Sequence, residues 1–244
     1  MTSAPIAEQR LLIDLQDIDA ALARLAHERR ALPLLARIET TITRLKDNKR
    51  AALLATAALS EAKQGATHAE DEVGQVVRRA AALRERLAAG GDAARDLTAI
   101  QGEIDQLGRR QAVLEDAQIA AMEALEAAQA ESDRLAAEEQ TIRAAGRELT
   151  AERDAEFTRI DEETERLRAR RDELAGTISA ALLADYDAAR AATGGLGVLA
   201  LRGHRLEGGS VELSPAELAR IDAAPADAII HAEENDVILV RMDI

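Results

Sequence analysis

Four histidines and no cysteine limit the chemistry that this chain of 244 residues could perform. Zinc is bound by thiolate, imidazole and carboxylate ligands, and without cysteine only the last two remain. A metal site could be assembled from four residues near the C-terminus: His204, His231, Glu233 and Asp236. Their spacing matches no zinc knuckle, so the alternative interpretation, polar residues exposed on turns, is the simpler one. We expect no metal and no cofactor.

No other motif predicts catalysis. His27 and His68 lie in long helical patterns without a matching nucleophile or acid. Gly194, Gly195 and Gly197 resemble a dinucleotide fingerprint in letters alone, because no strand–helix–strand pattern surrounds them. We interpret them as the end of a helix. The sequence therefore predicts a protein that is not an enzyme.

The candidate binding residues are seven arginines close to a turn signal at residues 90–92: Arg78, Arg79, Arg84, Arg86, Arg95, Arg109 and Arg110. One interpretation is a docking face for a partner protein. The other is a solvated helix surface, because residues 72–115 hold seven basic and seven acidic side chains and such mixtures usually support exposed helices. The net charge of −14 comes from residues 116–244, which disfavours nucleic acid and anionic lipid as partners.

The elements that must position these arginines are two long heptad stretches on either side of Gly90-Gly91-Asp92. Apolar residues recur in alternating steps of four and three, as in Leu11, Leu15 and Ile18 before the turn and Ile100, Ile104 and Leu107 after it. A mean spacing of 3.5 residues is typical of a coiled coil. The pattern predicts a mainly α fold: a long antiparallel two-helix coiled-coil hairpin over residues 1–191.

Details of the hairpin follow from the same pattern. Pro33 predicts a kink, with the heptad resuming through Leu35, Ile38, Ile42 and Leu45. The second helix is expected to run from about residue 93 to residue 191, with residue i facing about residue 182 − i. Alanines should then meet across the middle, with Ala62, Ala66 and Ala69 opposite Ala117, Ala120 and Ala121.

Composition agrees with long helices rather than a broad globular core. Aromatic residues make up 1% of the chain, and two-helix seams need only leucine, isoleucine and alanine. We see no basic and apolar leader at the N-terminus and no apolar run of the roughly 18 residues that a membrane span needs. We expect a cytoplasmic protein, monomeric or weakly homodimeric, that does not bind membranes.

Residues 192–244 read as a separate small β-rich module. Val198–Leu201, Ala228–His231 and Val237–Val240 have strand composition, and further strand segments fit between residues 204 and 213. Ser214-Pro215-Ala216-Glu217 predicts a capped helix to about residue 223.

The chain resembles the bacterial C4-type zinc-ribbon proteins with an N-terminal coiled-coil hairpin, in their actinobacterial form. The resemblance is carried by Arg95–Gln101, Leu107–Gln111 and, in the tail, Leu201–Gly208 and Ile238–Arg241. The family pattern would place its four zinc-binding cysteines at Leu206, Gly209, Ala232 and Asn235. The resemblance therefore implies a degenerate zinc-ribbon-like domain without metal, held by apolar packing instead.

Two functions remain open. The resemblance implies a non-enzymatic adaptor or scaffold, because relatives are described as partners of transcription or secretion machinery, including an alternative sigma factor. The alternative is a nucleic-acid-binding regulator, since zinc ribbons often bind nucleic acid and the resemblance extends to relatives described as binding RNA. The acidic tail and the lack of stacking aromatics count against this alternative.

Overall fold

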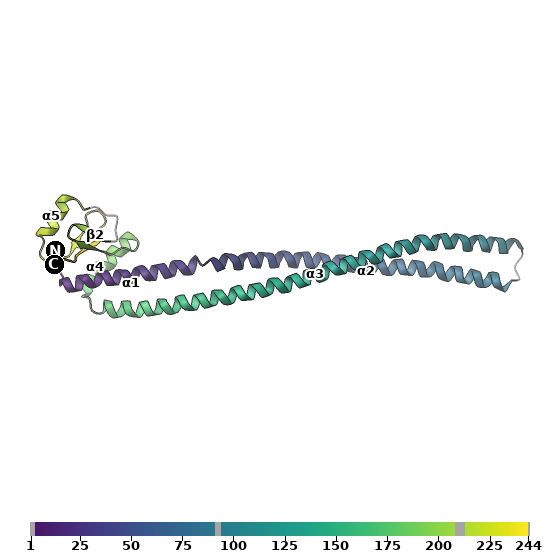
Figure 1. Ribbon diagram of the computed structural model, residues 1–244, viewed down its shortest axis with the longest axis horizontal. Coiled ribbons are helices and arrows are strands. Elements are labelled where there is room, and N and C mark those ends of the chain that lie inside the picture. Colours follow the sequence, from purple (N-terminus) through teal and green to yellow (C-terminus); the bar gives the residue numbers. More distant parts are fainter. Residues whose placement is uncertain (1–2, 91–93, 208–212, 244) are drawn as a thin grey trace. The chain divides into compact units, whose positions relative to one another are not determined.

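The computed structural model describes residues 3–90, 94–207 and 213–243. It is mainly helical with one four-stranded sheet (Figure 1), which confirms the predicted helical hairpin with a small β-rich C-terminal part. The elements are α1 (Ile6–Arg30), α2 (Pro33–Ala89), α3 (Ala94–Ala175), α4 (Ala180–Thr193), β1 (Val198–Arg202), β2 (Arg205–Glu207), α5 (Pro215–Ala223), β3 (Ile230–His231) and β4 (Ile238–Arg241).

The chain forms two compact units. The first, the base unit, contains Met1–Leu35 and Ala151–Ile244, and the second, the distal unit, contains Ala36–Thr150. The predicted boundary between residues 191 and 192 separates the hairpin from the β-rich tail. The division into compact units does not test it, so it stays a prediction.

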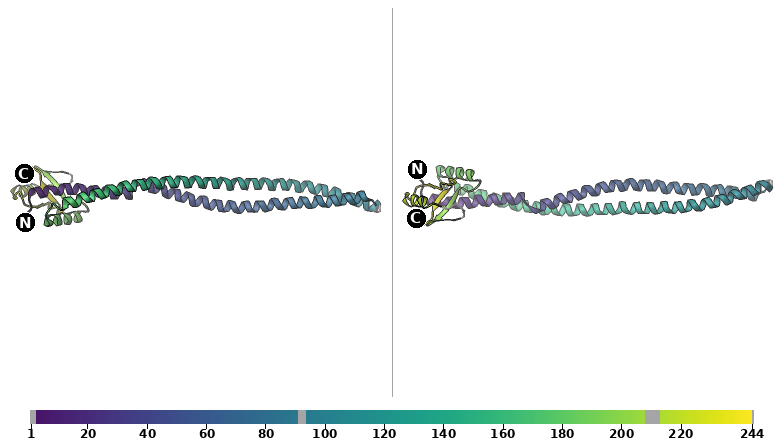
Figure 2. Two further views of the ribbon diagram at one scale, coloured as in Figure 1. Left: turned by 90° about the horizontal axis from the view of Figure 1, so that it is seen from below. Right: turned by 90° about the horizontal axis from the view of Figure 1, so that it is seen from above.

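The distal unit is an antiparallel pair formed by α2 and α3, which lie side by side in all the views of Figures 1 and 2. The less exposed residues of α2 follow alternating steps of four and three: Thr41, Leu45, Asn48, Ala52, Ala55, Leu59, Ala62, Ala66, Ala69, Val73, Val76, Ala80, Leu83 and Leu87. This repeat is the predicted coiled-coil seam. Gly90 follows α2 with a φ of 62°, whereas Gly91 and Asp92 of the predicted turn lie outside the described residues.

The predicted register is accurate to about one residue. Residue 79 should face residue 103, and Arg79 is hydrogen-bonded to Glu103. Residue 48 should face residue 134, and the Asn48 side chain donates to the carbonyl of Leu135, one residue further along.

Two details of the predicted seam are wrong. Ile42 is 48% exposed and Thr41 takes the seam position, because the step after Ile38 is three residues rather than four. Ala117 and Ala120 are also exposed. Counting on from Leu107, the steps of four and three place Gln118 and Ala121 on the seam beside Leu114, and these residues face the alanines of α2.

In the base unit, α1 ends at Arg30 and α2 begins at Pro33, which confirms the predicted break. Proline fixes φ near −65° and has no N–H to donate, so it fits the first position of a helix and not its interior. The N–H of Ala31 still bonds to the carbonyl of His27 and closes the last turn of α1.

The predicted continuation of the second helix to residue 191 is wrong. Helix α3 ends at Ala175, and α4 starts at Ala180 after the extended residue Ser179. Ile178 lies in the break, and it packs in the core of the base unit together with Leu182 and Tyr186 of α4. Gly194, with a φ of 76°, ends α4 as expected for a left-handed C-terminal glycine.

The sheet has the strand order β2-β1-β4-β3, with β1 and β4 parallel and the outer pairs antiparallel. Side chains alternate across it. Val198 and Ile238 point into a core with α1 and α4, and Leu199 and Leu239 point into a second core with α5. Because both faces are covered, β1 reads as a run of buried residues rather than an alternating one.

The tail elements agree with the sequence signals. The Ser214 side chain accepts a hydrogen bond from the N–H of Glu217 and caps α5. Residues 233–235 form the turn before Val237. At the N-terminal end of the unit, Ser3 forms a bridge with Ala228, and the buried amide of Gln9 donates to the carbonyls of Ala4 and Asp227.

Candidate partner-binding groove near the hairpin turn

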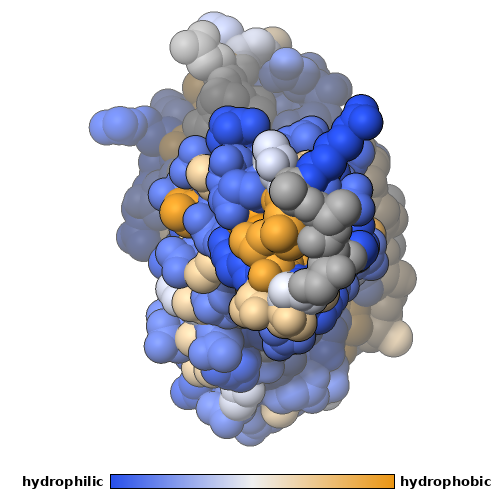
Figure 3. Space-filling model, turned by 90° about the vertical axis from the view of Figure 1, so that its right-hand side faces the viewer, coloured by the Kyte–Doolittle hydropathy of each residue, from blue (hydrophilic) through white to orange (hydrophobic). Residues whose placement is uncertain are grey.

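The end of the distal unit next to the turn, here called the tip, comprises residues 72–89 of α2 and 94–115 of α3. Its core is the cluster of Leu83, Ile100 and Ile104, with Leu87 and Leu107 packed against it. These aliphatic side chains occupy consecutive seam positions and hold the two helices together. Figure 3 views the molecule from this end and shows a small apolar patch in a largely hydrophilic surface.

A groove runs along one side of the tip. Its floor is Val76 of α2 and Leu107 of α3, and its walls carry Glu72, Gln75, Arg79 and Arg110 in a hollow of about 260 Å³. A second hollow on α3 shares Leu107 and Arg110 and is lined also by Ala99, Glu103 and Gln106. We call these two adjoining hollows the tip groove.

The charges of the tip groove are unevenly compensated. Arg79 donates from Nε and Nη2 to Oε1 of Glu103, over 3.2 and 2.9 Å. Glu72 lies 3.5 Å from Nδ1 of His68, measured at Oε2. Arg110 forms no ion pair with any described residue. Arg110, which lines both hollows, therefore carries a positive charge that no described carboxylate pairs with.

The structure brings two of the seven predicted arginines together, Arg79 and Arg110. All seven are exposed, but they do not share one face. Arg78 and Arg109 sit two residues after the seam positions Val76 and Leu107, on the outer sides of their own helices. The Arg78 side chain folds back over Gly74, with Nη1 3.1 Å from where a Cβ would be. Of the others, Arg84, Arg86 and Arg95, none lines the groove.

Sequence reasoning missed the apolar part of this surface. Leu107 was identified only as a seam residue, and Val113, which is 68% exposed, was not singled out. Val113 follows the groove residue Gln106 by seven positions, so it lies on the same side of α3. Its position outside the seam could have identified Val113 from the sequence, because an apolar residue there is not needed for packing between the two helices.

The residues considered for a metal site do not converge. His204 pairs with Asp222 at 3.2 Å, and His231 lies 3.1 Å from Asp185 and 3.5 Å from Asp236. Glu233 is near Arg220 instead. Within residues 3–90, 94–207 and 213–243, no three histidine or acidic side chains are grouped as ligands of one ion.

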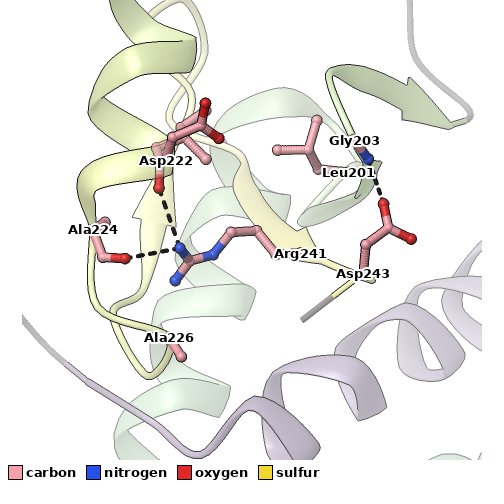
Figure 4. A pocket seen from close by; sticks show the side chains of 8 residues that line it. Leu201, Gly203, Asp222, Ala224, Ala226, Arg241 and Asp243 are labelled. Atoms are coloured by element: carbon pink, nitrogen blue, oxygen red, sulfur yellow. Dashed lines mark hydrogen bonds between the residues drawn. The ribbon is translucent and has the colours of Figure 1, made fainter.

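A hollow in the base unit has its main polar group already engaged (Figure 4). The nearly buried Arg241 side chain donates from Nη1 to the carbonyls of Ile221 and Ala224, at 3.1 and 3.0 Å, and from Nη2 to Pro225. These carbonyls lie in the last turn of α5 and in the segment that follows it. Arg241 therefore stabilises the end of α5, and we assign it a structural role rather than a role in ligand binding.

Most groups of a buried polar network in the base unit are bonded to one another, whereas Nε of Arg190 lies 3.5 Å from Oδ2 of Asp19 and makes no hydrogen bond. Asp19, 2% exposed, accepts hydrogen bonds from Nε of Arg171 at 2.7 Å and from the Tyr186 hydroxyl at 2.9 Å. The bond to Asp19 raises the pKa of Arg171, and burial followed by the charge of Asp19 raises the pKa of Tyr186. Gln16 bridges the carbonyl of Gly195 and the N–H of Gly197. This network fixes α1 and α3 to α4 and the sheet.

Comparison with known proteins supports the architecture. A family model for the CT398-like coiled coil hairpin domain matches residues 15–194. Uncharacterised proteins from two strains of Mycobacterium tuberculosis are 33% identical, with 98% of either chain covered. A solved structure from Mycobacterium smegmatis is 29% identical with a TM-score of 0.82, covering 99% of this chain and 100% of that one.

CT398 from Chlamydia trachomatis is similar in fold, at 16% identity and a TM-score of 0.64 over 97% of this chain and 98% of its own. None of the helices in the described part of the chain combines the length and apolar character that a membrane span requires.

Proposed function

Because the chain belongs to the CT398-like coiled-coil hairpin family, we propose that it is a non-enzymatic scaffold that binds a protein partner at its tip groove. The observation that carries this proposal is the pairing of an apolar floor, Val76 and Leu107, with the uncompensated guanidinium of Arg110. Val76 is buried and Leu107 only partly buried, and accessible apolar surface next to an arginine is typical of protein-binding surfaces.

The rest of the molecule is consistent with support rather than catalysis. Among the described residues, the buried titratable side chains Asp19, Tyr186, Glu217 and Arg241 are each bonded to groups of the chain itself. The seam of the distal unit is filled mainly by aliphatic side chains and alanines. We therefore assign these parts to holding the binding surface in place, and we propose that the protein acts in the cytoplasm.

The finer assignment of the tail, a zinc-ribbon-like module that has lost its metal, is part of the proposal. Two of the four family cysteine positions, Leu206 and Ala232, belong to one apolar cluster with Leu199, Ile230 and Val237. The Asn235 side chain accepts from the N–H of Val237 at 3.3 Å, and Gly209 lies outside the described residues. Packing of Leu206 and Ala232 in a common core would replace metal bonds by buried aliphatic area.

The test is affinity capture from native lysate, with and without nuclease, using the full chain and an Arg79→Glu/Arg110→Glu double variant as baits. The proposal expects a protein that survives nuclease and is lost with the double variant. Loss of all captured material on nuclease treatment would instead favour a nucleic-acid-binding regulator. Circular dichroism of both baits checks that the helices are intact.

A further inference from the structure

We infer that the tip groove binds an acidic amphipathic helix of a partner protein, which lies along α2 and α3 as a third helix of the coiled coil. This inference rests on the proposed function and names the chemistry of the partner. Three observations carry it: the spacing of the groove residues, the state of its charges and the exposed apolar side chain beside it.

The spacing is that of a helix-binding surface. Leu107, Arg110 and Val113 are three residues apart, so they are successive neighbours on one side of α3. Val113 and the groove residue Gln106 are seven residues apart, roughly 10 Å along the helix axis. Two helices side by side present a row of holes between their seams, and a third helix fills such holes with residues spaced by three and four.

The apolar contacts would bury side chains that are now in water. Val113 is 68% exposed and Leu107 is only partly buried. Across the seam, the predicted register places residue 69 opposite Val113, and Ala69 there is small and buried. An aliphatic residue of the incoming helix would meet Leu107, and one about two turns further on would meet Val113.

The charges select an acidic partner. Of the two carboxylates of the groove, Glu103 is paired with Arg79, and Glu72 lies beside the ring of His68. Arg110 has no ion-pair partner among the described residues. A carboxylate placed over Arg110 at the edge of an apolar contact would form an ion pair partly shielded from water, where charge pairs contribute most to specificity.

The experiment selects binders from a display library of random 16-residue peptides on the full-length protein, with counter-selection on the Arg110→Glu variant. The expected binders carry aliphatic residues spaced by three, four and seven, flanked by Asp or Glu. In a fluorescence anisotropy titration with the best peptide, Arg110→Glu and Val113→Glu each weaken binding by about tenfold or more, and added salt weakens it further.

The matched control is Arg147→Glu, since Arg147 is exposed on the same helix outside the groove. It should leave the affinity unchanged. Circular dichroism should show the same helicity for all variants. Basic binders, no enrichment over the Arg110→Glu variant, or equal loss with Arg147→Glu would overturn the inference. So would an Arg110-dependent interaction of a 20-nucleotide RNA in place of the peptides. Failure here together with capture of a protein from lysate that is lost with the Arg79→Glu/Arg110→Glu variant would leave the proposed function standing without this partner.

Discussion

At the residue scale, Tyr186 reports on the buried network that joins α1 and α3 to α4. It is the chain's one tyrosine, it is fully buried, and its hydroxyl donates to the buried carboxylate of Asp19. Burial and the neighbouring negative charge both oppose formation of tyrosinate and raise the pKa of Tyr186. An unfolded tyrosine ionises near pH 10.

The sign of the pH dependence follows. Because the folded pKa is the higher one, the contribution of Tyr186 to stability is complete below about pH 10 and is lost as the pH rises above that value. We expect the absorbance change of tyrosinate at alkaline pH to be delayed beyond the normal tyrosine range. It should coincide with loss of helical signal. Ionisation near pH 10 with the helices intact would contradict the buried Tyr186–Asp19 contact.

Two glycines provide a second test at this scale. A Cβ on Gly197 would lie 2.4 Å from Cε2 of the Tyr186 ring, whereas a Cβ on Gly65 would meet nothing within 4 Å. Gly197→Ala should therefore lower the free energy of unfolding by about 1–3 kcal/mol through overpacking. Gly65→Ala, in the interior of α2, should raise it by about 0.5–1 kcal/mol. Denaturant titrations measure both, and equal effects of the two substitutions would contradict the packing around Tyr186.

The tip groove illustrates what residue patterns do not reveal. The arginines near the turn were visible in the sequence, yet only Arg79 and Arg110 share a groove. Which side of a helix an arginine occupies follows from its offset to the seam, so the heptads could have predicted which arginines line the groove. They could not have predicted that Arg110 has no ion pair, because this depends on side chains from both helices.

At the scale of elements, the heptads and turn signals predicted the helices, the break at Pro33 and the antiparallel register. They failed at the end of α3. The 3.5-residue rhythm continues through Ile178 and Leu182, so nothing local marks the break. These residues are apolar because they pack in the core of the base unit. A single glycine, Gly176, costs only about 1 kcal/mol in a helix and gives no clear signal by itself.

The antiparallel pairing of α1 with α3 can be tested within one chain. Glu28 and Arg159 are ion-paired, and both are exposed, so spin labels at residues 28 and 159 should not disturb the core. We expect the separation of two adjacent helices, whose axes lie about 10 Å apart. Leu22 and Ile160 also line a common hollow, but Ile160 is buried, so a label there would disturb the core. Dilution with unlabelled protein should leave the signal unchanged, and its disappearance on dilution would indicate pairing between chains.

At the scale of the whole molecule, the proposal assigns support to the base unit and binding to the distal one. The base unit must then fold without metal. Leu206 and Ala232 already belong to its apolar core, and fully burying an aliphatic side chain contributes roughly 1.5–3 kcal/mol.

Elemental analysis of the purified protein should accordingly find no stoichiometric zinc. A strong chelator should leave the amide protection of Ile230 and of Ile238–Val240 intact, because these residues belong to the sheet. One tightly held zinc per chain, or unfolding of the sheet in chelator, would refute the metal-free module and return His204 and His231 to consideration as ligands.

The central claim is that a protein partner docks on the tip groove, and photo-crosslinking in the native cells tests it most directly. A photoreactive amino acid at Val113 is placed beside the groove, and one at Leu54, 66% exposed on α2, serves as the matched control. The account predicts a protein adduct at residue 113 that disappears with Arg110→Glu and has no counterpart at residue 54. Equal adducts at both positions, an adduct insensitive to Arg110→Glu, or an adduct with nucleic acid would contradict it.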